Sequence, residues 1–130
     1  MVSLTKLSLK NFAVVSETTI DLGSGLNVIT GETGTGKSLV VGAINLLLGD
    51  RGRKEYIRSG SDHAVVEGVF AGNLFELEPI LSEEEITLDG QSLSMTRELF
   101  ADGRSRCLIN DSRVNLETFR KIGERICDLH

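Results

Sequence analysis

The sequence predicts an α/β fold in which a mixed sheet surrounds one buried helix and an antiparallel β meander lies beside it. A glycine-rich loop at 31–38 stands between a short β-rich run and an apolar segment with helical character. Two Asp-Gly pairs, at 89–90 and 102–103, each separate segments in which apolar and polar residues alternate, which is typical of hairpins. A length of 130 residues suits one domain with one core.

The first 30 residues are expected to form strands. Apolar residues alternate with polar ones around Leu7 and Leu9 and again from Thr18 to Leu22, which is the period of a half-buried strand. The residues Gly-Ser-Gly at 23–25 indicate a turn. The run at 26–30 is β-rich with little alternation, as in a strand that is covered on both faces.

A helix is expected next, at 37–48, and it is apolar on almost every side, so it belongs in the core. Gly49 supplies a C-terminal cap. Strands are then predicted at 63–70 and on both sides of each Asp-Gly pair, joined by an acidic connector that contains Pro79. A last helix begins after Asn115, its expected N-cap, with apolar residues at helical spacing.

The loop at 31–38 matches the phosphate-binding pattern GxxxxGK[ST] in full. Its residues are Gly31, Glu32, Thr33, Gly34, Thr35, Gly36, Lys37 and Ser38. The glycines allow the backbone N–H groups to turn toward phosphate oxygens, and the helix that follows adds its unpaired N–H groups and partial positive charge. A dinucleotide-binding loop fits less well, because the third glycine of GxGxxG is missing.

These residues predict that the chain binds ATP with Mg²⁺. Lys37 can reach the β- and γ-phosphates, and at about 4 Å and an effective dielectric near 20 such a pair interacts by about 4 kcal/mol before desolvation. The Ser38 hydroxyl is suited to ligate Mg²⁺. The alternative for the loop is a glycine-rich turn with an exposed lysine, which we consider much less consistent with the flanking strand and helix.

Charge and composition exclude several classes of protein. The net charge is −5 and the pI is near 5.0, which argues against a surface coated for nucleic acid. Two segments, 50–58 and 103–113, concentrate arginine and lysine, but acidic residues interrupt both, so a solvated face is favoured over a binding patch. No apolar run is long enough for a membrane span, no signal peptide is indicated, and the two cysteines suggest neither zinc nor a disulfide framework. We expect a cytoplasmic protein.

The surroundings of the loop resemble the RecN family of bacterial DNA-repair ATPases, which are related to the structural-maintenance-of-chromosomes (SMC) proteins. The resemblance is carried by LTKLSLKNFAVVSETTIDLGSGLNVITGETGTGKSLVVGAINLLLGDR at 4–51 and by the later pieces YIRSG, ADGRSRCLIN and ICDLH. It implies the N-terminal lobe of an ABC/SMC-type head. It also implies that Asn11, in "KNF", lies near the nucleotide base and that Arg58 lies near nucleotide or DNA. Phe12 is as consistent with plain core, and Arg58 with an ion pair to Glu55. Gly42 departs from the aspartate that is common in these heads.

The resemblance also implies what lies outside these residues. In the family a coiled coil and a C-terminal lobe follow, and that lobe supplies the signature motif and the catalytic carboxylates. We therefore expect residues 1–130 to be one lobe of a larger ATPase, with no complete catalytic set. The implied partners are DNA, the C-terminal lobe of the same protein and a second head in a head-to-head homodimer, in a nucleoid-associated protein of the bacterial cytoplasm. The alternatives are a small P-loop kinase and a non-catalytic module that binds DNA or a partner protein.

Overall fold

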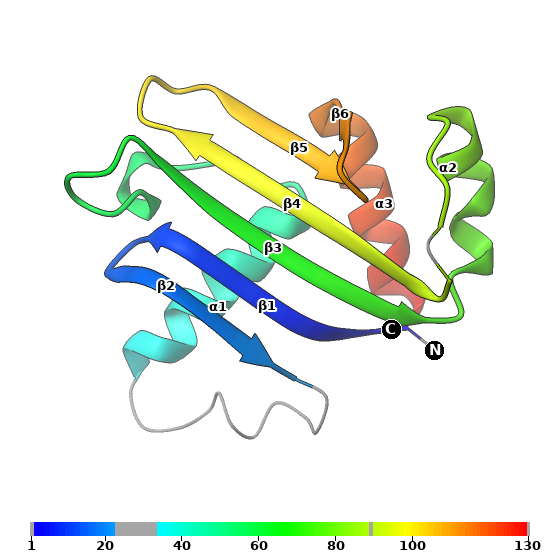
Figure 1. Cartoon of the computed structure of the whole chain (residues 1–130), viewed down its shortest axis with the longest axis horizontal. Helices are drawn as coiled ribbons and strands as arrows, with labels where there is room; N and C mark the ends of the chain where they lie inside the picture. Colours follow the sequence, from blue (N-terminus) through cyan, green and yellow to red (C-terminus); the bar gives the residue numbers. More distant parts are fainter. Residues whose placement is uncertain (1, 23–33, 89, 130) are drawn as a thin grey trace.

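The computed structural model describes residues 2–22, 34–88 and 90–129. Its described strands form one six-stranded sheet in the order β2-β1-β3-β4-β5-β6, and every neighbouring pair is antiparallel (Figure 1). The strands are β1 (Val2–Phe12), β2 (Val15–Asp21), β3 (His63–Gly72), β4 (Ser92–Phe100), β5 (Ser105–Ile109) and β6 (Ser112–Val114). The covered strand predicted at 26–30 lies outside the described residues.

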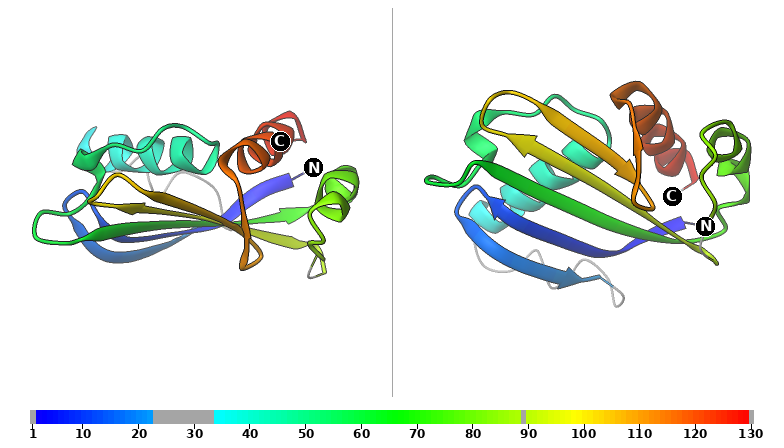
Figure 2. Two further views of the ribbon diagram at one scale, coloured as in Figure 1. Left: turned by 90° about the horizontal axis from the view of Figure 1, so that it is seen from above. Right: turned by 45° about the horizontal axis from the view of Figure 1, so that its top comes forward.

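Two long helices, α1 (Gly34–Leu47) and α3 (Leu116–Leu129), lie on the same face of the sheet (Figure 2). The shorter elements are η2 (Lys54–Tyr56), η3 (Phe75–Leu77) and α2 (Glu78–Glu83), and α2 lies beyond the end of the sheet near both chain termini. This is a two-layer arrangement of helices on a sheet. None of the helices in the described part of the chain has the length and apolar character to cross a membrane.

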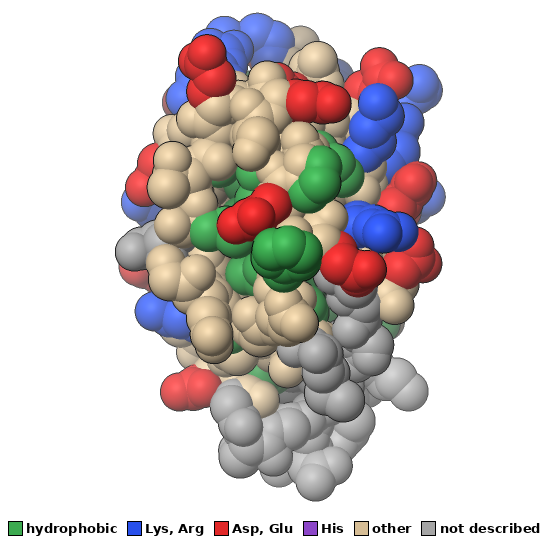
Figure 3. Space-filling view, turned by 90° about the vertical axis from the view of Figure 1, so that its right-hand side faces the viewer, with side chains coloured by type: hydrophobic (Ala, Val, Ile, Leu, Met, Phe, Trp, Pro, Cys, Tyr) green, Lys and Arg blue, Asp and Glu red, His purple; other side chains and the backbone are tan. Residues whose placement is uncertain are grey.

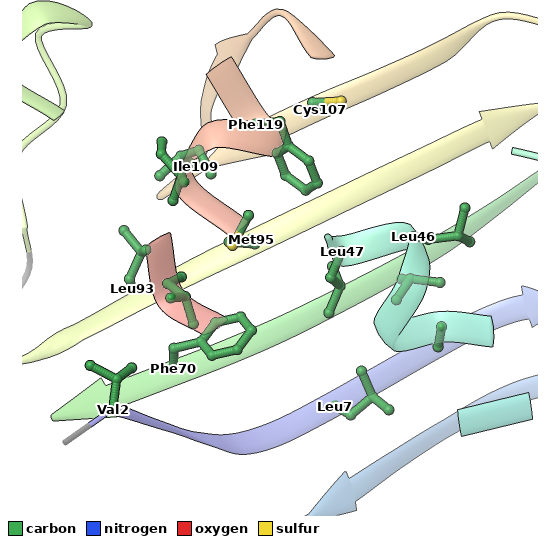
Figure 4. Close-up of a cluster of buried hydrophobic side chains, with 14 of the residues drawn as sticks. Val2, Leu7, Leu46, Leu47, Phe70, Leu93, Met95, Cys107, Ile109 and Phe119 are labelled. Carbon is green, nitrogen blue, oxygen red and sulfur yellow. The ribbon is translucent and has the colours of Figure 1, made fainter. Parts of the chain in front are cut away.

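The core lies between the sheet and the two long helices, because each central strand turns every second side chain toward them. In β4, for example, Leu93, Met95 and Leu99 are buried, and the residues between them are half-buried except for Arg97. Side chains from α1 and α3, among them Leu47 and Phe119, fill the other half of this layer (Figure 4). Twenty-four hydrophobic residues form one buried cluster, so the described part of the chain has one core.

The structure confirms the second predicted hairpin and the last helix. Strands β4 and β5 are joined across the Asp-Gly pair at 102–103, where Gly103 has a φ of 95°. Helix α3 begins after Asn115, whose Oδ1 atom accepts a hydrogen bond from the backbone N–H of Thr118 at 2.7 Å. The N-cap prediction is therefore confirmed.

The first predicted hairpin is wrong. Residues 86–88, ahead of the Asp-Gly pair at 89–90, form no strand, and β4 pairs with β3 and β5. Both edges of β4 are thus occupied, and the acidic connector contains the short helix α2. The local turn signal was real, but the tertiary pairing of β3 with β4 decided which strands meet.

The helix predicted at 37–48 begins at Gly34, three residues earlier than expected. Glycine is tolerated there because the first turn's N–H groups need no partner within the helix. Its predicted burial on almost every side is also only partly correct. Ala43, Leu46 and Leu47 are buried against the sheet, but Val41 is 50% exposed.

Candidate functional site

The phosphate-binding motif lies at the start of α1. Gly31, Glu32 and Thr33 lie outside the described residues, whereas 34–37 form the first turn of the helix and Ser38 follows on its exposed side. The first N–H groups of a helix have no partner within it and carry a partial positive charge. There is no acidic residue in this turn to compete for them. The described half of the motif therefore has the backbone expected of an anion-binding helix start.

The helix is held close to the sheet by a glycine. A Cβ atom added at Gly68 of β3 would lie 2.5 Å from Cδ1 of Leu47, so a larger residue there would force the Leu47 side chain to move. Gly68 is followed on the same strand by Val69 and Phe70, and β3 lies near the centre of the sheet. Core packing against the sheet therefore sets the position of α1.

Two arginines bind the C-terminal end of α1. Arg97 of β4 is 1% exposed, and its Nη1 donates to the carbonyl oxygens of Leu46 and Asp50 at 3.1 and 2.8 Å. Arg120 of α3 donates from Nε and Nη2 to the carbonyl oxygen of Gly49 at 3.3 and 3.0 Å. Cations are favourable at a helix C-terminus, where carbonyl groups lack partners. Burial lowers the pKa of Arg97, and the repulsion from Arg120 adds to this.

Asn11, which the resemblance places near the nucleotide base, and Arg58, which it places near nucleotide or DNA, are neighbours. The N–H of Arg58 donates to the carbonyl oxygen of Asn11 at 2.8 Å, and the N–H of Ala13 donates to the carbonyl oxygen of Tyr56 at 2.7 Å. Asn11 has a φ of 51° and Ala13 a φ of 54°, both in the left-handed region. The Arg58 side chain is exposed, and no ion pair joins it to Glu55 in the described part of the chain.

Tyr56 is a residue of this region that the sequence reasoning missed. Its ring stacks on Phe12 with centroids 5.2 Å apart, and Phe12 is fully buried, which agrees with its core role. A Cβ atom at Gly42 would lie 3.3 Å from Cε1 of Tyr56, so the ring occupies the space beside this helix position. Gly42 therefore has a structural reason: it lets Tyr56 pack between α1 and the β1–β2 turn. In the sequence, the only signal for this contact is a glycine inside a predicted helix, because such a glycine often has a packing reason.

Comparison with known proteins places this geometry in a family. A family model described as an AAA domain matches residues 6–126. The chain belongs to the AAA domain family. The curated relatives of this AAA domain include the DNA repair protein RecN of Bacillus subtilis, 39% identical over 98% of this chain and 22% of the relative. RecN of Vibrio cholerae is 35% identical over 98% of this chain and 23% of the relative.

The RecN resemblance is thus confirmed, and the chain spans less than a quarter of the length of these relatives. Solved structures with the same fold include a chain from a study of ATP-driven dimerization and DNA-stimulated activation of SMC ATPases, with a TM-score of 0.72 at 23% identity over 95% of this chain and 79% of that one. The Smc head of Pyrococcus furiosus has a TM-score of 0.71 at 20% identity, over 97% of this chain and 33% of that one. The AAA domain therefore has the fold of an SMC-type ATPase head.

The residues of the AAA domain fit a nucleotide with Mg²⁺. Ser38 is exposed directly after the first turn of α1, beside backbone N–H groups that the helix leaves unpaired. A hydroxyl at this place matches the oxygen donors that Mg²⁺ prefers. The described residues contain no cluster of His, Cys, Asp or Glu that could hold a metal ion by itself. Phosphate oxygens and water would therefore have to complete the coordination of the ion.

Proposed function

We propose that residues 1–130 form the ATP-binding lobe of a RecN-like ATPase that acts in the repair of DNA double-strand breaks and in recombination. The observation that supports this most directly is the complete GxxxxGK[ST] motif at 31–38 leading into a helix packed on the sheet of an SMC-type head. The identity to RecN over nearly the whole chain supports the repair role. An antiparallel sheet does not suit a small P-loop kinase, whose core sheet is parallel.

In this proposal the residues of the motif have distinct tasks. The backbone N–H groups of 31–36 hold the phosphates, and the Lys37 ammonium neutralises charge on the β- and γ-phosphates. The Ser38 hydroxyl ligates Mg²⁺, and that ion, when bound, neutralises charge that develops during phosphoryl transfer. Asn11 is proposed to lie near the nucleotide base, and Arg58 near nucleotide or DNA.

Hydrolysis is proposed to need groups that this lobe does not supply. Phosphoryl transfer requires a positioned water and charge stabilisation around the γ-phosphate, and the first turn of α1 contains no acidic residue. The proposed partners are therefore the C-terminal lobe of the same protein and a second head in a head-to-head homodimer. DNA is a further proposed partner of the full-length protein, in the nucleoid of the bacterial cytoplasm.

Calorimetry of Mg²⁺-ATP binding tests the proposal. The chain is expected to bind ATP without turnover, and Lys37→Ala is expected to weaken binding at least a hundredfold, because an ammonium close to two phosphates contributes several kcal/mol. Lys121→Ala is the matched control, since this lysine is exposed on α3 and only 4.0 Å from Glu117 in a helical pair. Equal affinity of the two variants, or steady turnover by the chain alone, would contradict the proposal.

A further inference from the structure

The side chain of Tyr56 connects α1 to the β1–β2 turn. Its ring stacks on Phe12 with centroids 5.2 Å apart and an interplanar angle of 21°. The same ring also faces α1, since its Cε1, Cζ and hydroxyl oxygen lie 3.3 to 3.6 Å from the place of a Cβ at Gly42. The first turn of α1, the β1–β2 turn and η2 all lie at one end of the sheet (Figures 1 and 2). Tyr56 therefore packs between two parts of the chain that meet at this end.

The backbone around Tyr56 fixes the shape of the turn. The N–H of Ala13 donates to the carbonyl oxygen of Tyr56 at 2.7 Å, and the N–H of Arg58 donates to the carbonyl oxygen of Asn11 at 2.8 Å. Asn11 and Ala13 have φ angles of 51° and 54°, in the left-handed region that residues with a Cβ rarely adopt. Such a conformation persists only where the surrounding structure enforces it. The turn that carries Asn11 therefore depends on segment 56–58 for its conformation.

The ring of Tyr56 and the backbone hydrogen bonds have different effects. The hydrogen bonds define the turn itself and need no particular side chain at position 56. The contact with Gly42 is made by the ring, and it determines where the turn lies relative to α1. A glycine in the middle of a helix is destabilising, so its presence at position 42 is consistent with a requirement for this contact. Substitution of the ring therefore changes the placement of the turn and leaves its hydrogen bonds available.

We propose that Tyr56 is a positioning residue for nucleotide binding, which holds the β1–β2 turn in a fixed place relative to the first turn of α1. This role rests on the proposed function, in which the start of α1 holds the phosphates and Asn11 lies near the base. Gly42 lies eight residues after Gly34, so the ring meets α1 about 12 Å from the start of the helix. At that distance the ring does not touch the phosphates. Because a binding group loses much of its contribution when it is displaced by about 1 Å, loss of the ring weakens the contacts of the base and leaves those of the phosphates in place.

Calorimetry with two ligands separates this role from a general effect on the fold. The ligands are Mg²⁺-ATP and Mg²⁺-tripolyphosphate, which lacks the sugar and the base. Tyr56→Ala is expected to bind ATP about tenfold more weakly, the effect of losing about one well-placed polar contact, and to bind tripolyphosphate within about twofold of the unsubstituted chain. Tyr56→Phe keeps the ring and is expected to bind both ligands normally. Gly42→Leu retains Tyr56 but pushes its ring away from α1, and it is expected to show the same selective loss of ATP affinity.

Two control variants accompany these measurements. Phe75→Ala removes an exposed aromatic ring at the far end of the sheet and is expected to bind both ligands normally (Figure 1). Lys37→Ala is expected to weaken the binding of both ligands, because its ammonium acts on the phosphates.

The positioning role is overturned if Tyr56→Ala binds ATP normally. It is also overturned if this variant loses affinity for ATP and for tripolyphosphate equally, because the ring then acts only on the fold. If circular dichroism shows Tyr56→Ala to be unfolded, Gly42→Leu decides the question by the same two outcomes. If the unsubstituted chain binds neither ligand, the proposed function itself fails, and the positioning role fails with it.

Discussion

Gly42 and Arg97 show how single residues connect α1 to the rest of the chain. Gly42 leaves the space that the Tyr56 ring fills, and Tyr56 in turn stacks on Phe12. Arg97 reaches from the sheet to the carbonyl groups of Leu46 and Asp50. Gly42 acts through its small size in the middle of α1, and Arg97 acts through hydrogen bonds at the C-terminal end. Their contributions can be separated by substitution.

A side chain at position 42 is expected to conflict with Tyr56. Gly42→Leu introduces a good helix former but forces its Cβ to within 3.3 Å of the ring, so overpacking of about 1–3 kcal/mol opposes the gain in helix propensity. In a Tyr56→Ala background the same change is expected to be stabilising. Urea unfolding of the four proteins measures the coupling, which is expected to be about 1–3 kcal/mol. If the effects of Gly42→Leu and Tyr56→Ala on the free energy of unfolding are additive, the Tyr56 ring does not obstruct a side chain at position 42.

Loss of Arg97 is expected to destabilise the fold strongly. Arg97→Met keeps the aliphatic bulk but leaves the carbonyl groups of Leu46 and Asp50 without this donor, at a cost of about 2–4 kcal/mol in the free energy of unfolding. Arg125→Met is the control, because Arg125 is exposed and 3.9 Å from Glu76; its cost is expected to be below about 0.5 kcal/mol. Similar midpoints of urea unfolding for both variants would show that the hydrogen bonds from Arg97 to the end of α1 contribute little to stability.

At the scale of elements, the end of α1 and the start of the next segment depend on close contact with α3. Gly49 has a φ of 98°, and its N–H bonds to the carbonyl oxygen of Leu46 at 3.2 Å. A Cβ atom there would lie 2.8 Å from Cβ of Arg120, the residue whose guanidinium binds the Gly49 carbonyl. The C-terminal cap predicted from the sequence is confirmed, and the structure adds the contact with α3 as its second reason.

Substitutions at Gly49 and Gly60 separate the effect of a positive φ from the effect of the close contact with Arg120. Gly49→Ala and Gly60→Ala both place a Cβ on a residue with positive φ, at 98° and 90°, which costs about 1 kcal/mol. Nothing lies within 4 Å of a Cβ at Gly60, whereas Arg120 obstructs one at Gly49. Gly49→Ala is therefore expected to lower the free energy of unfolding by at least about 1 kcal/mol more than Gly60→Ala. Equal losses in thermal unfolding would assign the whole effect to the backbone.

At the scale of the whole molecule, one sheet is covered by α1 and α3 on one face, and its core spans both helices. Apolar side chains also reach the surface at the end that carries α2, where they lie among acidic and basic groups (Figure 3). Phe75 of η3 is 70% exposed there, near the ion pair of Glu76 with Arg125.

The reactivity of the two cysteines can be used to measure opening of the core, because one is buried and the other is exposed. Cys107 of β5 is 3% exposed and burial raises the pKa of its thiol, whereas Cys127 is exposed on α3. Because the thiolate is the reactive form, Cys107 stays protonated and unreactive at pH 8 in the folded chain. Iodoacetamide labelling followed by mass spectrometry is expected to give one rapid modification, at Cys127. Cys107 should react only with the rate of global unfolding, and Arg97→Met should accelerate it.

Local patterns predicted much of the secondary structure and failed where strands compete. The alternation in 63–70, the Asp-Gly turn at 102–103 and the Asn115 cap were all readable, because each depends on a few neighbouring residues. The Asp-Gly pair at 89–90 wrongly predicted a hairpin. Strand β4 pairs with β3 instead, and a pairing between strands so far apart in the sequence cannot be recognised from a local pattern. The same applies to the site: Asn11 and Arg58 were named by resemblance, but Tyr56 and Arg97 were missed.

The sequence by itself predicted the helix that follows the glycine-rich motif, and the family, because a full motif with its flanking pattern is a local and specific signal. Only the tertiary structure decided the rest. It brought Arg58 against Asn11, placed Arg97 and Arg120 on the end of α1, and gathered the cations of 51–54 around an apolar pocket with the β4–β5 hairpin. The hydrogen-bonded pairs among these residues are separated by 47 to 71 positions along the chain, and such pairs form only when the core packs.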